Sequence, residues 1–288
     1  MKSIPFCKFH GFGNDYIVIE RNAIPQATDL SKLAIAICHR NTGVGGDGIA
    51  VIEKLDVEDP ADFFCEIVNP DGSIAGFSGN GTRCAVSYLY YKEMWREPAL
   101  RLKTRSGIKN YTLIERIEDG HYWFEAEIGK PKLGGQEVPV KDASGESVVD
   151  HSIDVEGTTL LFSGVNVGNP VACVFVDSFD LDWRRYGRAM ETHPTFPERA
   201  NIVFVKVVDN ENVELRIWER GAGETSASGT CSSGAAVLSA FTGRTGRTVS
   251  VLSPGGTTEV HWRTDDEILL TGRADLAFCG EFPISPKV

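Results

Sequence analysis

The sequence contains no C-x-x-C pair, no cluster of basic residues and no apolar run that approaches the length of a membrane span. Its seven cysteines are an odd number, which argues against a disulfide framework and a structural zinc site. The 29 Lys and Arg residues stand against 40 Asp and Glu residues, an acidic balance that usually means only solubility, and the lack of a basic cluster disfavours nucleic-acid binding. The segment 1–10 lacks the apolar core of a signal peptide, so we expect a cytoplasmic enzyme without a membrane partner.

The order of the predicted elements indicates the fold class. The chain has 288 residues, enough for one large domain or two modest ones with a full core. Predicted strands outnumber helices and tight turns join many of them, as at Glu118-Asp119-Gly120, so we expect an α+β fold with mixed sheets. We place a domain junction near residue 120. Helices are expected at 28–41, 81–92, 181–191 and 230–241, and strands at 49–53, 63–68, 100–104, 111–116, 121–128, 202–208, 213–218, 248–252, 257–263 and 267–271.

Two small-residue loops each feed an apolar helix. Ser78-Gly79 precedes the apolar run Ala85–Tyr91, and Ser228-Gly229 precedes Ala235–Phe241. The first N–H groups of a helix have no intrahelical partner and lie at the positive end of the helix dipole, so they bind anions. Two such helix starts that face each other would hold one carboxylate between two opposed side chains. The alternative is a pair of ordinary Gly-rich helix caps.

The stretch Gly43–Gly48 matches the letters of the dinucleotide motif G-x-G-x-x-G. A predicted helix precedes it and a predicted strand follows, which is the reverse of the order that a dinucleotide site requires. The sequence contains no P-loop, zinc-protease helix or nucleophile elbow. We therefore expect neither a cofactor nor a metal.

Seven short blocks follow one another through nearly the whole chain: Lys8–Ile19 (KFHGFGNDYIVI), Gly43–Gly48 (GVGGDG), Asn69–Ser73 (NPDGS), Gly79–Cys84 (GNGTRC), Gly168–Pro170 (GNP), Phe196–Asn201 (FPERAN) and Glu219–Thr225 (ERGAGET). In content and order they resemble the diaminopimelate epimerase family. The resemblance implies two pseudo-symmetric domains, each a curved mixed β-sheet wrapped around a central helix, with a ligand cleft between them. With the junction above, the domains would be 1–120 and 121–276, and 277–288 would return to the first.

The resemblance also implies roles for individual residues. The two catalytic positions are Ser78 and Ser228, where the family has cysteines. Backbone N–H groups would bind the substrate carboxylate at the reacting carbon, namely those of Gly79, Asn80, Gly229 and Thr230. Glu219 would pair with the ammonium group next to it. The far end of the substrate would be held by Asn69, Asn169, Asn201 and Arg220, with Asn14 lining the cleft. The asparagines also suit turns, which is the alternative explanation for them.

This arrangement suits inversion at an amino-acid Cα. Two acid/base groups on opposite faces can remove and return the proton without a cofactor, and helix N-termini stabilise the negative charge that develops on the carboxylate. The expected function is epimerisation of LL- to meso-diaminopimelate, a step of lysine biosynthesis. The expected partner is a small amino-acid substrate, and a homodimer is left open.

The serines are the main departure from the family. A hydroxyl is a far weaker acid than a thiol and needs a base of its own. The histidine that the family often places after Asn-Pro is Val171 here. Cys84 and Cys231 are alternatives as displaced thiols, although helical geometry would aim them away from the substrate. Three explanations stay open: a deliberately inactivated chain, a natural relative with altered or lost chemistry, and an epimerase that uses serine poorly. The rival functions are an isomerase or dehydratase of another small carboxylate and a catalytically dead amino-acid-binding homologue.

Overall fold

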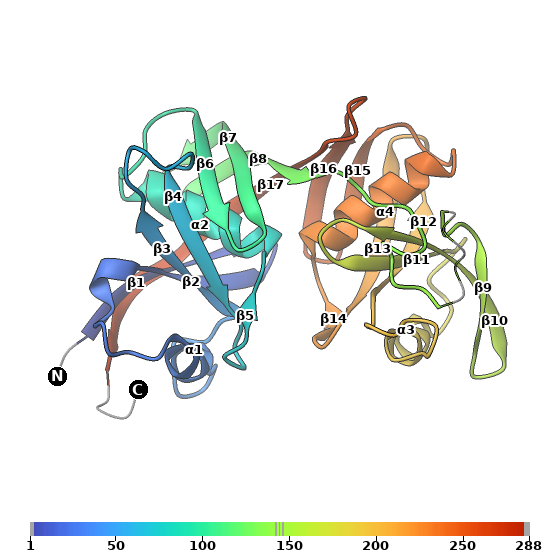
Figure 1. Ribbon diagram of the computed structural model, residues 1–288, viewed down its shortest axis with the longest axis horizontal. Helices are drawn as coiled ribbons and strands as arrows, with labels where there is room; N and C mark the ends of the chain where they lie inside the picture. The colour runs from blue at the N-terminus through green and yellow to red at the C-terminus, as the bar shows by residue number, and fades with distance from the viewer. Residues whose placement is uncertain (1–2, 142, 144, 146, 285–288) are drawn as a thin grey trace. The chain divides into compact units, whose positions relative to one another are not determined.

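The computed structural model describes residues 3–141, 143, 145 and 147–284 and divides the chain into two compact units (Figure 1). Unit 1 combines the residues up to Ala126 with those from Gly272 onward, and unit 2 spans Glu127–Thr271. The sequence placed these boundaries near residues 120 and 277. A boundary at residue 120 would cut the hairpin of β7 (Gly107–Glu118) and β8 (His121–Gly129), whose pairing extends to Ala126.

Unit 1 is a mixed sheet around a central helix. Its main strands are β1 (Ser3–Gly11), β2 (Asn14–Glu20), β3 (Gly48–Lys54), β4 (Phe63–Val68), the short β5 (Ile74–Ala75), β6 (Ala99–Thr104), β7 and β8. Neighbouring strands alternate in direction of pairing: β1–β2 is antiparallel, β2–β3 parallel, β3–β4 antiparallel and β4–β6 parallel. The helix α2 (Gly79–Tyr91) packs against β1 to β4 and is buried from Asn80 to Tyr90. Its burial on all sides makes it the core of the unit.

Unit 2 repeats this plan. Its strands are β9 (His151–Val155), β10 (Thr158–Asn166), β11 (Pro170–Phe175), β12 (Asn201–Val207), β13 (Asn212–Glu219), the short β14 (Gly223–Thr225), β15 (Thr248–Ser253) and β16 (Gly256–Trp262). From β10 to β15 the pairings run antiparallel, parallel, antiparallel and parallel, as from β1 to β6. The helix α4 (Gly229–Phe241) packs against six of these strands. The expected pair of curved sheets around central helices is confirmed.

The smaller helices lie at equivalent places in the two units. The helix α1 (Leu30–Cys38) and the 3-10 turn η1 (Arg21–Ala23) connect β2 to β3, and α3 (Trp183–Glu191) connects β11 to β12. The sequence predicted α1 from Thr28 to Asn41, but the carboxylate of Asp29 accepts hydrogen bonds from the N–H groups of the first turn and fixes a later start. The predicted hairpins and central helices are confirmed to within a few residues.

The last strand, β17 (Ile268–Pro283), starts in unit 2 and ends in unit 1, where it pairs with β1 from His10 to Ser3. The sequence predicted only its first part, 267–271, as a strand. Burial and exposure alternate there, whereas residues 277–279 are all exposed. That loss of alternation removes the signal on which the prediction of a half-buried strand depends.

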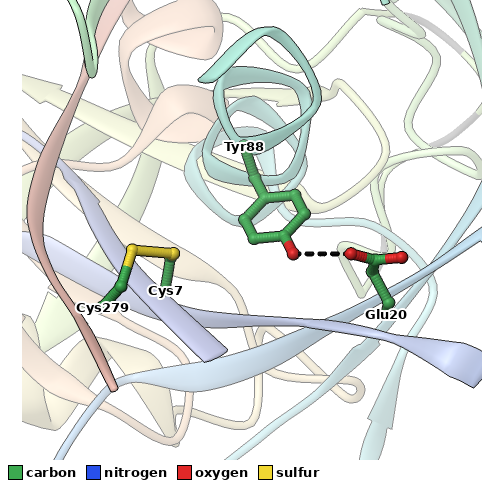
Figure 2. Close-up of a disulfide and its surroundings, with 4 residues drawn as sticks. All are labelled: Cys7, Glu20, Tyr88 and Cys279. Atoms are coloured by element: carbon green, nitrogen blue, oxygen red, sulfur yellow. Dashed lines mark hydrogen bonds between the residues drawn. A yellow bond between two sulfur atoms is a disulfide. The ribbon is translucent and has the colours of Figure 1, made fainter. Parts of the chain in front are cut away.

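A disulfide joins Cys7 of β1 to Cys279 of β17 (Figure 2). The two cysteines are direct partners in the antiparallel register, with their Cα atoms 4.0 Å apart. The odd cysteine count argued against a disulfide framework and did not predict this single bridge, which joins residues 272 positions apart. The other five cysteines are free and buried, as small apolar residues commonly are.

Candidate active site

Ser78 is the N-cap of α2 in unit 1. Its backbone is extended, with φ −138° and ψ 120°, and its Oγ accepts a hydrogen bond of 3.1 Å from the N–H of Gly81. The same Oγ lies 2.9 Å from the phenol oxygen of Tyr16 on β2. The sequence predicted the helix start at this serine but no partner for its hydroxyl.

Ser228 is the N-cap of α4 in unit 2 and has the same local conformation, with φ −149° and ψ 123°. Its Oγ accepts from the N–H of Cys231 at 3.5 Å and donates to Oε2 of Glu219 at 2.9 Å. The Oγ1 of Thr230 lies 3.4 Å from the same oxygen. The structure thus brings together three of the predicted site residues, Glu219, Ser228 and Thr230, at the start of α4.

Both serines act as helix caps, and both hydroxyls have a second partner besides the helix. Gly79 and Asn80 begin α2 just as Gly229 and Thr230 begin α4, so four of the predicted carboxylate-binding N–H groups lie in the first turns of two 13-residue helices. These N–H groups have no intrahelical acceptor and carry the positive end of the helix dipole. Each helix start therefore has the local chemistry of an anion site.

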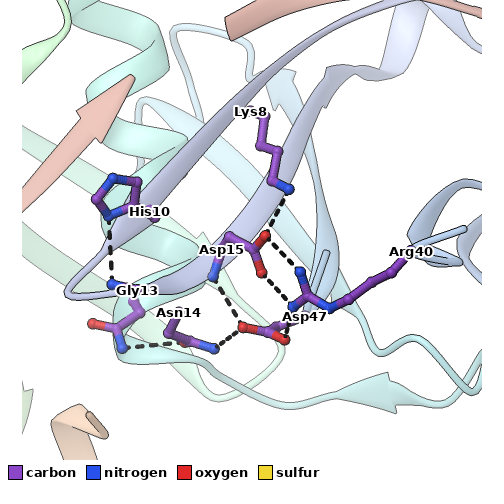
Figure 3. Close-up of polar contacts among 8 residues, drawn as sticks. Lys8, His10, Gly13, Asn14, Asp15, Arg40 and Asp47 are labelled. Atoms are coloured by element: carbon purple, nitrogen blue, oxygen red, sulfur yellow. Dashed lines mark hydrogen bonds and ion pairs between the residues drawn. The ribbon is translucent and has the colours of Figure 1, made fainter. Parts of the chain in front are cut away.

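A chain of side-chain hydrogen bonds fixes the predicted residues Asn14 and Asn80 in unit 1, and Figure 3 shows its end at Asn14 and Asp47. Arg83 donates to Oδ1 of Asn80 at 2.8 Å, and Nδ2 of Asn80 donates to Oδ1 of Asn14 at 3.1 Å. Asn14 in turn donates to Asp47 at 2.8 Å. The orientation of both amides follows from this chain, because a protonated guanidinium donates at one end and a carboxylate accepts at the other.

The anionic end of this network contains two carboxylates. Arg40 donates to Asp15 at 2.9 Å and to Asp47 at 2.7 Å, and Lys8 pairs with Asp15 at 2.7 Å. Burial by itself raises the pKa of Asp15, but the hydrogen bonds from Arg40 and Lys8 outweigh it and hold that pKa at about 2. Burial also raises the pKa of Asp47, and the hydrogen bonds from the Asp15 backbone and Asn14 do not offset this effect. Asp47 belongs to the glycine-rich block 43–48, which contributes this carboxylate to the network.

Asn69 and Asn169 occupy turns. The amide of Asn69 donates to Oγ of Ser73 at 2.9 Å within the loop that follows β4. The carbonyl of Asn169 accepts from the N–H of Val167 at 3.2 Å, and its side-chain amide has no hydrogen-bond partner among the residues that the structure describes. Turn chemistry therefore accounts for the side chain of Asn69, whereas that of Asn169 is available to a ligand.

Arg220 directly follows β13, which ends at Glu219, and is exposed. Its backbone N–H donates to Oδ1 of Asn201 at 2.9 Å, and Nη1 donates to the carbonyl oxygen of Glu198 at 3.0 Å. Within the described part of the chain no carboxylate pairs with its guanidinium, and Glu224 pairs with Arg184 instead. Arg220 therefore forms no ion pair with Glu198 or Glu224.

Glu191, at the end of α3, is a residue that sequence reasoning missed. Its buried carboxylate accepts from the N–H of Gly221 at 2.8 Å and from the indole of Trp218 at 3.0 Å. These two bonds hold the loop that carries Glu219 and Arg220. An exposed-looking helical Glu gives no signal of such a role in the sequence, because only the packing of α3 on β13 creates it.

The displaced-thiol alternative finds no support in the structure. Cys84 and Cys231 are fully buried. Burial raises the pKa of the Cys84 thiol to about 12 and that of Cys231 well above its usual range, so both stay protonated at neutral pH. Val171 is buried too and packs against Gly234 of α4, so it offers no substitute for a base.

The structure describes no helix with the length and hydropathy that crossing a membrane requires. Among the described residues, no group of three or more His, Cys, Asp or Glu side chains is arranged to hold a metal ion.

Comparisons with known proteins support the motif blocks. The family model for diaminopimelate epimerase matches residues 6–133 and 163–277. The chain is 37% identical over 281 residues to the diaminopimelate epimerase of Caldanaerobacter subterraneus subsp. tengcongensis, covering 97% of this chain and 99% of the relative. It is 36% identical over 286 residues to that of Microcystis aeruginosa, covering 98% and 99%.

Two solved structures are similar in fold. A hydroxyproline epimerase from Agrobacterium vitis has a TM-score of 0.72 at 17% identity, covering 99% of this chain and 94% of its own. A probable proline racemase from Agrobacterium radiobacter K84 has a TM-score of 0.72 at 16% identity, covering 98% and 94%. At these identities the likeness shows the fold alone.

Proposed function

The chain belongs to the diaminopimelate epimerase family, and we propose that it inverts the α-carbon of diaminopimelate, from LL to meso, with Ser78 and Ser228 as opposed acid/base groups. As a member it is an isomerase of the epimerase and racemase type. The observation that carries the proposal is the 2.9 Å hydrogen bond from the Ser228 hydroxyl to the Glu219 carboxylate. It gives this serine the base that a hydroxyl needs.

Proton removal takes place at Ser228. Its Oγ takes the Cα proton while its own proton passes to Oε2 of Glu219, so no free alkoxide forms. The C–H bond breaks, its electron pair stays on the substrate and spreads into the carboxylate, and the negative charge of Glu219 is neutralised. A carboxylate can accept from a hydroxyl and an ammonium at once, so Glu219 can also meet the substrate ammonium.

In this proposal the first-turn N–H groups of α2 and α4 donate to the oxygens of the substrate carboxylate, namely those of Gly79, Asn80, Gly229 and Thr230. The charge on these oxygens grows as the Cα proton leaves, so fixed donors bind the transition state more strongly than the ground state. The hydrogen-bonded chain from Arg83 through Asn80 to Asn14 holds one of these helix starts in place.

The distal end of diaminopimelate lies at Arg220. Its guanidinium has no carboxylate partner among the described residues, and a planar fork suits a carboxylate. The N–H of Arg220 is held by Asn201, and the next peptide by Glu191, so the chain at this point is fixed on two sides. Asn169 of unit 2, with its available side-chain amide, is a second donor for this distal carboxylate.

Deuterium wash-in tests the proposal. The chain is incubated with LL-diaminopimelate in D2O, and Cα deuteration of the meso product is followed by mass spectrometry. We expect deuterated meso product from the wild type and none from the double variant Ser78→Ala, Ser228→Ala. Wash-in to another small carboxylate, but not to diaminopimelate, would leave an isomerase with a different substrate.

One observation favours a second candidate, an amino-acid-binding homologue without catalysis. Both serines cap helices, through Gly81 and Cys231, and capping alone is reason enough for a serine at those positions. Calorimetric binding of diaminopimelate by a wild-type chain that exchanges no deuterium would establish this candidate and overturn the epimerase proposal.

A further inference from the structure

Tyr16 contacts the Ser78 hydroxyl from strand β2, 62 residues before it in the sequence. It lies on β2, paired with Phe9 of β1 and Gly48 of β3, and is only 6% exposed. Its phenol oxygen is 2.9 Å from Oγ of Ser78. Since the N–H of Gly81 already donates to that Oγ, Tyr16 is the group that can exchange a proton with it.

Two glycines hold the Tyr16 ring in place. A Cβ at Gly48 would lie 2.7 Å from Cε1 of the ring, and a Cβ at Gly81 would lie 2.8 Å from the same atom. Neither glycine has a left-handed backbone that would by itself require glycine. Both positions therefore need glycine for space, and the space is filled by the Tyr16 ring. The slot fixes where the phenol oxygen points.

We propose that Tyr16 is the positioning residue of Ser78 and resupplies its proton, as Glu219 accepts the proton of Ser228 in the other unit. This inference rests on the proposed function for its place in turnover. The contrast between a phenol and a carboxylate gives the two serines different tasks in the resting protein. Ser228 with Glu219 is ready to accept a proton, and Ser78 with Tyr16 is ready to donate one.

Ser78 gives its hydroxyl proton to the carbanion, forming the new C–H bond on its face of the substrate. The phenol proton of Tyr16 moves to Oγ of Ser78, and the O–H bond of Tyr16 breaks to leave a phenolate. A phenol, with an ordinary pKa of about 10, is a far stronger acid than a serine hydroxyl, so this transfer relieves the alkoxide. Proton exchange with solvent returns Tyr16 and Glu219 to their starting states.

A thiol at position 78 reports on Tyr16 without any need for catalysis. In the variant Ser78→Cys, iodoacetamide alkylates the introduced thiol. The rate of this alkylation is measured against pH, and the modified peptide is identified by mass spectrometry. Donation from the phenol stabilises the thiolate. Adding Tyr16→Phe should raise the thiol pKa by about one unit and slow alkylation at neutral pH about tenfold, since a hydrogen bond to a charged group is worth about that factor.

Tyr111→Phe is the matched control. The Tyr111 phenol is also buried and also bonds a side chain in the first turn of α2, Oγ1 of Thr82, at 2.6 Å. It has no hydrogen bond to Ser78. In the Ser78→Cys background, Tyr111→Phe should leave the alkylation profile unchanged. Equal profiles for Tyr16→Phe and Tyr111→Phe would overturn the inference.

Turnover gives the second readout. With Ser78 in place, Tyr16→Phe should slow deuterium wash-in about ten- to a hundredfold and change the affinity for diaminopimelate by less than about twofold, because the phenol acts on the proton and not on the ligand. If the wild type shows no wash-in, the proposed function fails and the alkylation profile alone decides the role of Tyr16. If the wild type exchanges and Tyr16→Phe exchanges equally fast, Tyr16 is structural.

Discussion

The two units carry the same helix start with a different partner at each serine. Ser78 and Ser228 have nearly identical backbone angles, and both cap a 13-residue helix that is buried in a mixed sheet of the same topology. Ser78 is bonded to a phenol and is partly exposed, whereas Ser228 is bonded to a carboxylate and is 7% exposed. The repeated fold fixes the position of each hydroxyl, and a residue from a neighbouring strand determines its chemistry.

This difference also appears in how each unit supports its site. In unit 1 a network of charged and amide side chains extends from Lys8 and Arg40 to Asn14, and the strands at its edge are joined by the disulfide of Cys7. In unit 2 the buried carboxylate of Glu191 and the side chain of Asn201 hold the loop before α4. Glu219, proposed as the proton acceptor, ends β13, and Arg220, proposed to bind the distal carboxylate, follows it directly.

The largest effect is expected for Glu219→Gln. The amide keeps the size of the side chain but cannot accept the Ser228 proton as a base, so deuterium wash-in should fall about a hundredfold or more. Glu214→Gln, on the same strand, is the matched control and should have little effect. A fall of less than about threefold in Glu219→Gln would show that Ser228 does not depend on this carboxylate.

Arg220→Lys should weaken binding of diaminopimelate about ten- to a hundredfold, because the charge remains but the planar fork is lost. Affinity for a one-ended amino acid should stay the same. Calorimetric titration with both ligands measures the difference, and Arg216→Lys, on the preceding strand β13, is the control. Equal loss for both ligands would place Arg220 in a structural role and remove the main reason for naming diaminopimelate.

Restoring both thiols, by Ser78→Cys and Ser228→Cys together, should raise wash-in about tenfold or more. A thiol at a helix N-terminus ionises near neutral pH, whereas a hydroxyl needs its partner for every proton transfer. Each single variant should change proton transfer only at the position substituted, Ser78 in unit 1 or Ser228 in unit 2. A wild type that is faster than the double variant would mean that the serine partners outperform thiolates here.

The smallest effect concerns the network of unit 1. The pKa of Asp15 is lowered to about 2, so its contribution to stability is fully present above its ordinary pKa and is lost as the pH falls through about 2. Asp15→Asn should therefore lower the melting temperature by a few °C near pH 6, and the difference should shrink as the pH falls from about 4 to about 2. A difference independent of pH would assign the effect to packing.

Sequence patterns predicted the helix starts at Ser78 and Ser228 because capping and apolar periodicity are local properties. The fold class followed from the order of strands and turns for the same reason. Tyr16 and Glu191 could not be assigned roles, because each contacts its partner only through packing of elements far apart in the sequence. The disulfide of Cys7 was missed because register, and not cysteine count, brings the two strands together at that point.

A crystal structure of the chain with bound diaminopimelate tests the opposed-serine mechanism most directly. The substrate Cα should lie between Ser78 and Ser228, with their Oγ atoms about 6–7 Å apart, since each must come within about 3 Å of the reacting centre. The α-carboxylate should rest on the first turns of α2 and α4, and the distal carboxylate on Arg220. Hydroxyls more than about 12 Å apart in the closed, ligand-bound protein would contradict the mechanism.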